Sequence, residues 1–384
     1  MDTPVTRDDR SMTEEEILRL PVVKAIQPFS DERHLPSEPG TLGYIESPSK
    51  PDISLEVEQL PAMPGAGIEG LTWKIKLSSQ SGSLRKGLPG VRAHRLSAEE
   101  IIQGAASYDD KVGNVQLGTE PFRPSSLDVQ PIPRIIPLPA RPLRPLRSSS
   151  PDFLQDVLLR MMGNQLADTS YPWSTIGKIW VGSTSDWQTR WTGTGVLVGP
   201  NFLLTAGHVA PWFLGPWFMR FVPAYNDGNM PYGESYVSDF FGYNSRGDVT
   251  GQDYVICRLY NPLGNTTGWL GSQSWGNDEP YEEGSWISAG YPGSFFNAER
   301  PGVQYFIKIV DIDNEGEGRE LETERFANPG WSGGPLFGWI GGQPKVIGVE
   351  SGEETDFLQP RYNVFAGGKP MVDLIKHGWA IWQP

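Results

Sequence analysis

The sequence predicts a mainly β protein, and three observations support that prediction. Short runs of β-branched and aromatic residues recur after residue 170, each bounded by Gly, Pro or Asn. Helical segments do not alternate with them, which favours a sandwich or barrel over a parallel α/β sheet. Thirteen of the 14 tryptophans also lie after residue 170, which indicates that the core lies there.

The expected elements follow in chain order. The last segment, 369–382, reads "KPMVDLIKHGWAIW" and spaces Met371, Leu374 and Ile375 as one face of a helix. We therefore expect the chain to end in a helix that follows the strands. The expected strands span 176–183, 193–208, 253–260, 285–292, 304–312 and 345–352.

The first part of the chain has a different composition. Nineteen of the 35 prolines lie before residue 170. The stretch 130–147, "QPIPRIIPLPARPLRPLR", is proline-dense and basic, and proline at this density predicts an extended linker. We expect a functional domain at 170–384, preceded by a largely irregular region at 1–169 with short helices.

Three short helices are expected before residue 170. Two begin at capping boxes, in which a Ser or Thr side chain and a Glu three residues later satisfy each other's backbone amides. The third, 151–162, begins with proline and is followed by Gly163. The two capping boxes pair Thr13 with Glu16 and Ser97 with Glu100.

Composition limits the possible functions. The net charge of −14 argues against nucleic-acid binding and against adhesion to anionic membranes. No apolar run reaches the roughly 18–20 residues of a membrane helix. Cys257 is the single cysteine, so an intramolecular disulfide and a cysteine metal cluster are excluded. The polar start predicts no secretory signal peptide, hence a cytoplasmic protein or one exported without a standard leader.

Three residues stand at strand–loop junctions of the predicted β domain. His208 follows the apolar run "NFLLTAG", Asp253 opens "DYVICRL", and Ser332 is central in "ANPGWSGGPLFG". Taken singly, each has a structural alternative, namely a packing histidine, a strand cap and a glycine-rich turn. The order His, Asp, Ser is the order of one known nucleophilic triad. Of the other histidines, His377 lies near the end of the predicted helix, where we expect it to be solvated or to complement the helix dipole.

The motifs "LLTAGHV", "DYVICRL" and "GWSGGPLF" resemble the catalytic signatures of chymotrypsin-like (trypsin-like) serine proteases. The domain start "YPWSTIGKIWV", the lack of disulfides and the "GHV" triplet are more similar to the glutamyl endopeptidase-like branch of bacteria and fungi. The resemblance covers 170–384. It implies an all-β double six-stranded antiparallel β-barrel with a C-terminal helix.

The resemblance also implies a serine endopeptidase that works through an acyl-enzyme, without cofactor or metal, on protein or peptide substrates. Ser332 would be the nucleophile, which needs a base within hydrogen-bond reach. His208 would be that base, and Asp253 would hold its tautomer. The backbone N–H groups of Gly330 and Ser332 would form the oxyanion hole.

One departure from the family pattern concerns activation. The residue before the nucleophile is usually an aspartate that pairs with a newly cut N-terminal amine, and here it is Trp331. We therefore expect packing to hold this loop. The region 1–169 is interpreted as a propeptide-like or regulatory segment that contacts the protease domain in cis.

The substrate pocket implied by the resemblance has Phe326 and Ala327 at its base and Glu350, Ser351 and Gly352 along one wall. Glutamyl-specific relatives have a histidine at the place of Glu350, so acidic specificity is in doubt. A glutamate there favours a basic substrate residue, whereas Phe326 favours an apolar one. The alternative is a solvated rim charge. The hydroxyl of Ser351 would support the catalytic aspartate.

Two other function classes stay open. A protease-like fold that only binds partners would keep the same motifs without activity. An α/β-hydrolase esterase also uses Gly-x-Ser-x-Gly, but it orders its triad Ser, Asp, His, and only His377 follows Ser332.

The acidic stretch 311–324 lacks the spacing of a calcium-binding EF-hand loop and predicts an exposed hairpin. Cys257 is expected to be a buried thiol.

Overall fold

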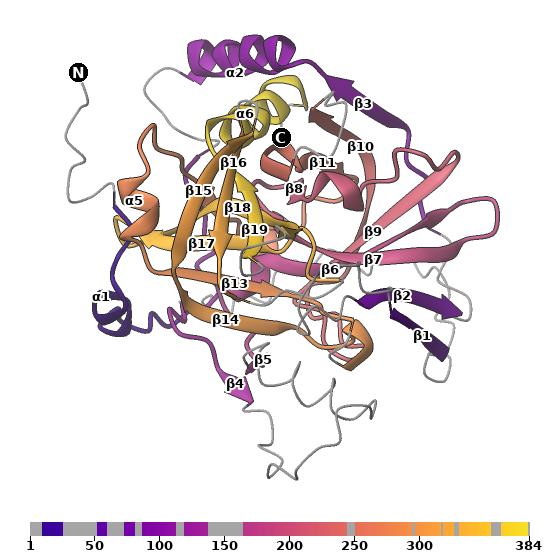
Figure 1. The fold of residues 1–384 in the computed structure, drawn as a ribbon, viewed down its shortest axis with the longest axis horizontal. Helices are drawn as coiled ribbons and strands as arrows, with labels where there is room; N and C mark the ends of the chain where they lie inside the picture. The colour runs from indigo at the N-terminus through magenta and orange to yellow at the C-terminus, as the bar shows by residue number, and fades with distance from the viewer. Residues whose placement is uncertain are drawn as a thin grey trace, which may run out of the picture.

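The computed structural model describes residues 10–25, 52–59, 73–80, 87–112, 119–136, 164–243, 250–293, 296–315, 318–325, 330–354 and 362–382. Two large β-sheets lie side by side and form most of the body (Figure 1). Helix α6 (Lys369–Trp382) packs near the first sheet, and α2 (Ala98–Val112) lies over α6.

The first sheet is a closed antiparallel barrel of six strands. Its order is β11-β8-β7-β6-β9-β10, and pairing of β10 with β11 closes it. A seventh strand, β3 (Arg92–Leu96), adds to β10 in parallel. The barrel strands are β6 (Ile176–Ser183), β7 (Gln188–Leu197), β8 (Phe202–Thr205), β9 (Trp217–Pro223), β10 (Ser235–Tyr243) and β11 (Val255–Leu259).

The second sheet is a half-barrel with the order β15-β16-β19-β18-β17-β13-β14-β5-β4, and β12 pairs with β18 at its side. The predicted all-β fold class with a C-terminal helix is confirmed, although this second sheet does not close. Its strands are β4 (Ile135–Ile136), β5 (Asn164–Leu166), β12 (Gly271–Ser272), β13 (Trp286–Gly290), β14 (Gly302–Ile307), β15 (Ile309–Glu315), β16 (Gly318–Thr323), β17 (Pro335–Ile340), β18 (Gln343–Glu354) and β19 (Tyr362–Gly367).

The remaining elements are short. Both predicted capping boxes form, and they begin α1 (Glu14–Leu18) and α2. A separate hairpin pairs β1 (Asp52–Gln59) with β2 (Trp73–Gln80). No helix in the described ranges is both long and apolar enough to cross a membrane. The other helices are α4 (Gly264–Thr267), α5 (Glu279–Glu282) and the 3-10 turns η1 (Trp173–Thr175), η2 (Gly207–Val209), η3 (Thr250–Gln252) and η4 (Phe296–Ala298).

Segments before residue 170 contribute to both sheets and to the main core. Strand β3 extends the barrel, and β4 and β5 extend the half-barrel. Apolar burial of this kind is the dominant favourable term in folding, so the described N-terminal segments are part of the packed body. Their side chains in the main core are Ile17, Leu96, Ile101, Tyr108 and Leu166.

Every segment predicted as a strand overlaps at least one strand, although 304–312 includes the end of β14 and the start of β15. The C-terminal helix buries Met371, Leu374 and Ile375 completely. Cys257 is fully buried on β11, where burial raises the pKa of its thiol. The predicted helix at 151–162 and most of the predicted linker, 137–147, lie outside the described residues. The expectation of a solvated His377 is wrong, because this side chain is buried between α6 and α2.

Candidate active site

His208 and Asp253 come together because their strands are neighbours. His208 lies in η2, directly after β8, and Asp253 lies just before β11. These strands are antiparallel, with Thr205 opposite Val255, so the end of one meets the start of the other. His208 Nδ1 lies 2.6 Å from Asp253 Oδ2, and the His208 amide donates to Oδ1 at 2.8 Å.

The Asp253 carboxylate is held by a third donor. The Ser351 hydroxyl on β18 donates to Oδ2 at 2.7 Å. Burial acts to raise the pKa of Asp253, but hydrogen bonds from His208 and Ser351 and the charge of His208 outweigh burial and lower it. The carboxylate therefore stays ionised, and it accepts the Nδ1 proton of His208.

The imidazole of His208 is partly open to solvent, with 47 % of its side-chain surface exposed. Burial of the ring acts to lower its pKa, but the hydrogen bond and charge of Asp253 outweigh that effect and raise the pKa above its usual value. With Nδ1 engaged, Nε2 is the nitrogen left to accept a proton.

The loop 330–334 carries Ser332 and packs against the segment that carries His208. Gly330 has φ +101° and Gly333 has φ +81°, a backbone region that favours glycine. A Cβ at Gly333 would lie 2.0 Å from Thr205 Oγ1 and 2.8 Å from Ala206 N. The Ser332 carbonyl accepts from the Thr194 amide at 2.9 Å.

The Ser332 side chain is half-buried. Within the described ranges, its hydroxyl makes no hydrogen bond with His208, and neither the Gly330 amide nor the Ser332 amide donates to a backbone carbonyl. Catalytic hydrogen bonds are often long before substrate binds.

Trp331 is buried, with 1 % of its surface exposed. Its ring packs against Gly290 and Gly302, where a Cβ would come within 2.8 Å and 3.0 Å of it. Its indole N–H donates to the Ser288 hydroxyl at 2.9 Å. Packing and one neutral hydrogen bond therefore hold this residue in the loop.

The structure bears differently on each residue predicted to line the substrate pocket. Phe326 and Ala327 lie outside the described residues. Glu350 is only 2 % exposed and accepts from the Asn363 amide at 2.6 Å, so the interpretation as a solvated rim charge is wrong. Ser351 faces Asp253, and Gly352 has open space where a Cβ would stand.

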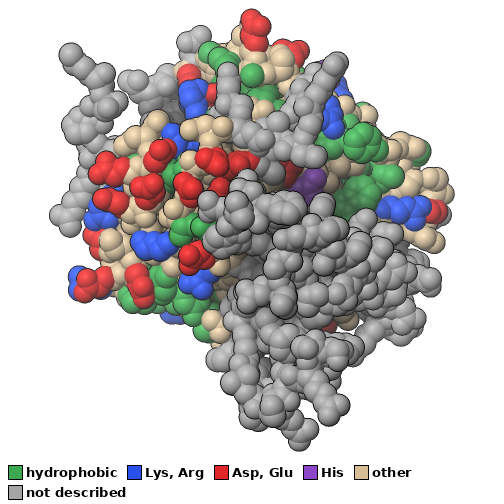
Figure 2. Space-filling model, in the orientation of Figure 1, with side chains coloured by type: hydrophobic (Ala, Val, Ile, Leu, Met, Phe, Trp, Pro, Cys, Tyr) green, Lys and Arg blue, Asp and Glu red, His purple; other side chains and the backbone are tan. Residues whose placement is uncertain are grey.

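The acidic stretch 311–324 forms the β15–β16 hairpin, where acidic side chains gather on the surface (Figure 2). The predicted exposed hairpin is correct for Asp311 and Asp313 but not for Glu320 and Glu322, which are buried. Carboxylate oxygens of Asp313, Glu320 and Glu322 lie within 4.8 Å of one another. They are the one group of possible metal ligands found in the described ranges.

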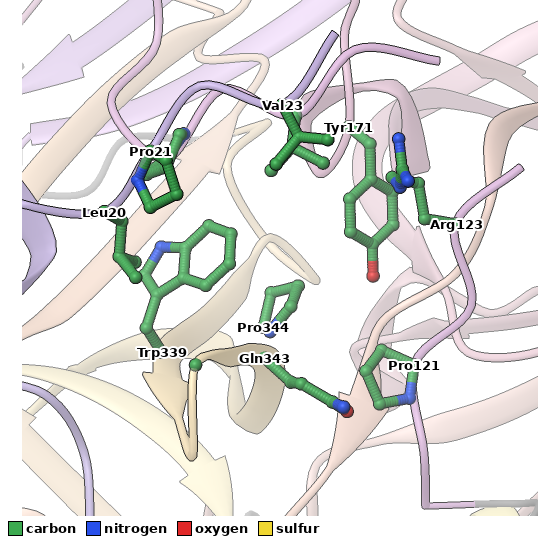
Figure 3. Close-up of a pocket in the computed structure, with 12 residues that line it drawn as sticks. Leu20, Pro21, Val23, Pro121, Arg123, Tyr171, Trp339, Gln343 and Pro344 are labelled. Atoms are coloured by element: carbon green, nitrogen blue, oxygen red, sulfur yellow. The ribbon is translucent and has the colours of Figure 1, made fainter. Parts of the chain in front are cut away.

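A pocket of about 300 Å³ lies where N-terminal segments meet the β17–β18 turn. Leu20, Pro21 and Trp339 line one side, and Tyr171 and Arg123 line the other (Figure 3). None of the residues that carry the candidate triad lines it, so it is separate from the candidate site.

Two polar residues near the site were not among the residues predicted from the sequence. Thr194 stands between two glycines in a strand that continues as an apolar run, and Lys178 is the one charged residue of "IGKIWVGS". Both are buried. A polar or charged residue inside a predicted core strand is the signal that could have found them, because burial requires a partner.

Comparisons with known proteins place the chain. The family model for trypsin matches residues 163–375. Similar solved structures include a Glu endopeptidase in complex with MPD, with 16 % identity, a TM-score of 0.45, and coverage of 55 % of this chain and 93 % of that one. Protease Anisep from Arthrobacter nicotinovorans has 21 % identity, a TM-score of 0.40, and coverage of 52 % and 93 %.

A thermostable serine protease, AL20, from an extremophilic microorganism has 17 % identity, a TM-score of 0.42, and coverage of 55 % of this chain and 99 % of that one. The comparison with curated proteins found no match. The family model covers more than half of the chain, so the chain belongs to the trypsin family of chymotrypsin-like serine proteases.

Proposed function

We propose that this protein is a serine endopeptidase with His208, Asp253 and Ser332 as its catalytic triad. The observation that supports this most is the hydrogen bond of 2.6 Å between His208 Nδ1 and Asp253 Oδ2, next to the loop that carries Ser332. This arrangement leaves His208 Nε2 as the base on the side of the ring that Asp253 does not occupy.

The proposed reaction has two halves. His208 takes the Ser332 proton as Oγ attacks the scissile carbonyl, and then gives it to the leaving amine. Water hydrolyses the acyl-enzyme by the same route in reverse. Asp253 stays ionised throughout and stabilises the imidazolium, consistent with the directions of both pKa shifts.

The oxyanion of the tetrahedral intermediate would bind the Gly330 and Ser332 amides. Oxyanion donors act most strongly when they are fixed before the reaction. The positive φ of Gly330 and the buried ring of Trp331 support a loop that is already ordered.

For substrate preference, we propose that the enzyme does not select glutamate, in contrast to the glutamyl endopeptidase branch. Glu350 stands where that branch has a carboxylate-binding histidine, and it is buried against Asn363. A carboxylate at this place does not favour a second one from the substrate. The proposed choices are a basic or an apolar residue, which a peptide-library cleavage profile would separate.

For the region 1–169, we propose a propeptide-like or regulatory role in cis. Its described parts add β3 to the barrel and place α2 on α6. Mass spectrometry of the purified protein, combined with activity measurements, tests this role. A stable full-length species with full activity would remove the propeptide interpretation.

A fluorophosphonate probe tests the catalytic proposal on the full chain. We expect the wild type to be labelled on Ser332 and Ser332→Ala to be unlabelled. Ser174→Ala is the matched control, because Ser174 is a buried serine that donates to Thr267 O away from the site. A wild type that keeps its fold and stays unlabelled, both before and after any cleavage within residues 1–169, would instead favour a protease-like binding module.

A further inference from the structure

A buried lysine on the first sheet pairs with a glutamate from the segment between β13 and β14 of the second sheet. Lys178 on β6 is 1 % exposed, and its Nζ lies 2.7 Å from Oε1 of Glu299, which follows η4. Its ammonium also lies 4.6 Å from the centre of the Trp180 ring and 5.1 Å from that of Tyr225. A buried ammonium needs a partner, so the pair ties the segment that carries Glu299 to the first barrel.

The pair continues into a chain of hydrogen bonds. The Tyr225 hydroxyl donates to the second carboxylate oxygen of Glu299. The Tyr291 hydroxyl in turn donates to the Tyr225 carbonyl at 2.8 Å. Tyr291 directly follows β13, at the start of the segment that ends in Glu299. Tyr291 at the start of this segment therefore binds Tyr225, and Glu299 at its end binds both Tyr225 and Lys178.

Thr194 connects this segment to the loop. Its hydroxyl oxygen accepts from the Tyr291 amide at 3.0 Å and donates to the Gly330 carbonyl at 2.7 Å. Its own amide donates to the Ser332 carbonyl at 2.9 Å. Thr194 is completely buried. One residue thus binds the backbone at both positions whose amides would form the oxyanion hole.

The loop also rests directly on Tyr291. A Cβ at Gly330 would lie 2.4 Å from the Tyr291 carbonyl oxygen. A shift of Tyr291 would therefore move Gly330 both through Thr194 and through direct contact.

We propose that Thr194 is a positioning residue of the oxyanion site and that the buried Lys178–Glu299 pair holds in place the segment that Thr194 connects to it. The inference rests on the proposed protease function. It gives a route by which the loop stays ordered with Trp331 in place of an aspartate.

The first test compares Thr194→Val with Thr194→Ser in the full chain. Valine keeps the shape and removes the hydroxyl, whereas serine retains it. We expect valine to slow phosphorylation by diisopropyl fluorophosphate and to lower kcat for p-nitrophenyl acetate by about tenfold to a hundredfold, with KM little changed, because small displacements of reacting groups have effects of this size. Serine should restore most of the rate.

Thr175→Val is the matched control, since Thr175 is a fully buried threonine whose hydroxyl donates to Pro172 O at 2.7 Å, away from the site. The control should lose a similar amount of thermal stability but keep its rate. The ³¹P NMR shift of the phosphorylated serine, whose P=O oxygen occupies the oxyanion site, should change in Thr194→Val only.

The second test concerns the ion pair. Lys178→Met should lower the phosphorylation rate, and the control Lys345→Met should not, because Lys345 pairs with Glu120 away from the loop. Removing one partner of a buried pair can unfold a protein, so Lys178→Met/Glu299→Gln, which removes both charges, is the second variant. It should fold and still react slowly.

The outcomes separate the two proposals. If the wild type reacts with the probe but folded Thr194→Val and the double variant react as fast as it does, the positioning role is wrong and the protease function stands. If the wild type itself does not react, either before or after any cleavage within residues 1–169, the protease function fails first.

Discussion

Ser351 and His208 bind the same oxygen of Asp253. The Ser351 hydroxyl lies 2.7 Å from Oδ2, and His208 Nδ1 lies 2.6 Å from it. Because a carboxylate oxygen has two lone pairs, it can accept both bonds. This shared acceptor joins β18 of the half-barrel to His208, the proposed base, on the barrel.

Ser351→Ala should therefore weaken catalysis without unfolding the protein. A hydrogen bond to a charged group is worth about 1.5–3 kcal/mol, so we expect kcat/KM to fall by about tenfold to a hundredfold. The measurement is p-nitrophenyl acetate hydrolysis alongside thermal unfolding. An unchanged rate in a folded variant would show that Asp253 needs no support from β18.

The pH dependence of activity should follow His208, which must be neutral to act as a base. Asp253 raises the pKa of His208, so the acid limb of kcat/KM should lie above pH 6.5, the ordinary value for histidine. Asp253→Asn should move this limb to lower pH and reduce kcat by about 10⁴-fold. A wild-type limb below pH 6.5 would contradict the interpretation.

His377 should make the folded state less stable at acidic pH. Burial lowers the pKa of His377, although the nearby Glu100 acts to raise it. A pKa that is lower in the folded state means that the unfolded chain binds more protons, so stability should fall as pH drops below about 6.5. His208, with its raised pKa, contributes the reverse trend. His377→Gln should reduce the loss of Tm between pH 7.5 and 5.5, and an unchanged loss in the folded variant would contradict this interpretation.

The contact of α2 with α6 can be tested at Gly104. A Cβ there would lie 1.9 Å from His377 Nδ1. Gly104→Ala should destabilise the protein by about 1–3 kcal/mol through overpacking, although alanine favours helix. Urea unfolding measures the change. Combining it with His377→Ala should recover stability, and a lack of recovery would show that the strain lies elsewhere.

Substitutions at Gly333 and Gly342 should distinguish backbone strain from steric crowding. Both have positive φ, +81° and +76°, but only Gly333 has neighbours where a Cβ would stand. Gly342→Ala should cost about 1–2 kcal/mol from strain alone. Gly333→Ala should cost more and should abolish fluorophosphonate labelling, since Thr205 and Ala206 cannot move without shifting His208. Equal effects of the two substitutions on unfolding and labelling would contradict the packing described here.

The fold class and the His208–Asp253 pair were predictable because local signals agree with tertiary structure. One apolar run ends just before His208, and another begins just after Asp253. Antiparallel pairing of β8 with β11 then brings the two residues together. Other features depend on long-range packing. Strands β9 and β10 were not predicted. The burial of Glu350 depends on Asn363 of β19, and that of His377 depends on Gly104 of α2. Periodicity along one segment does not report such partners.

The packing of α2 against α6 also limits when the barrel can finish folding. Tyr108 from α2 and Trp379 from α6 belong to the same core cluster as Phe202 and Ile256 of the barrel. The barrel cannot complete this cluster until α6 has been synthesised, since contacts of such wide sequence separation form late. Without α6, the chain would carry His208, Asp253 and Ser332 but lack this packing on the barrel. We therefore expect the barrel to reach its native packing only after α6 has docked.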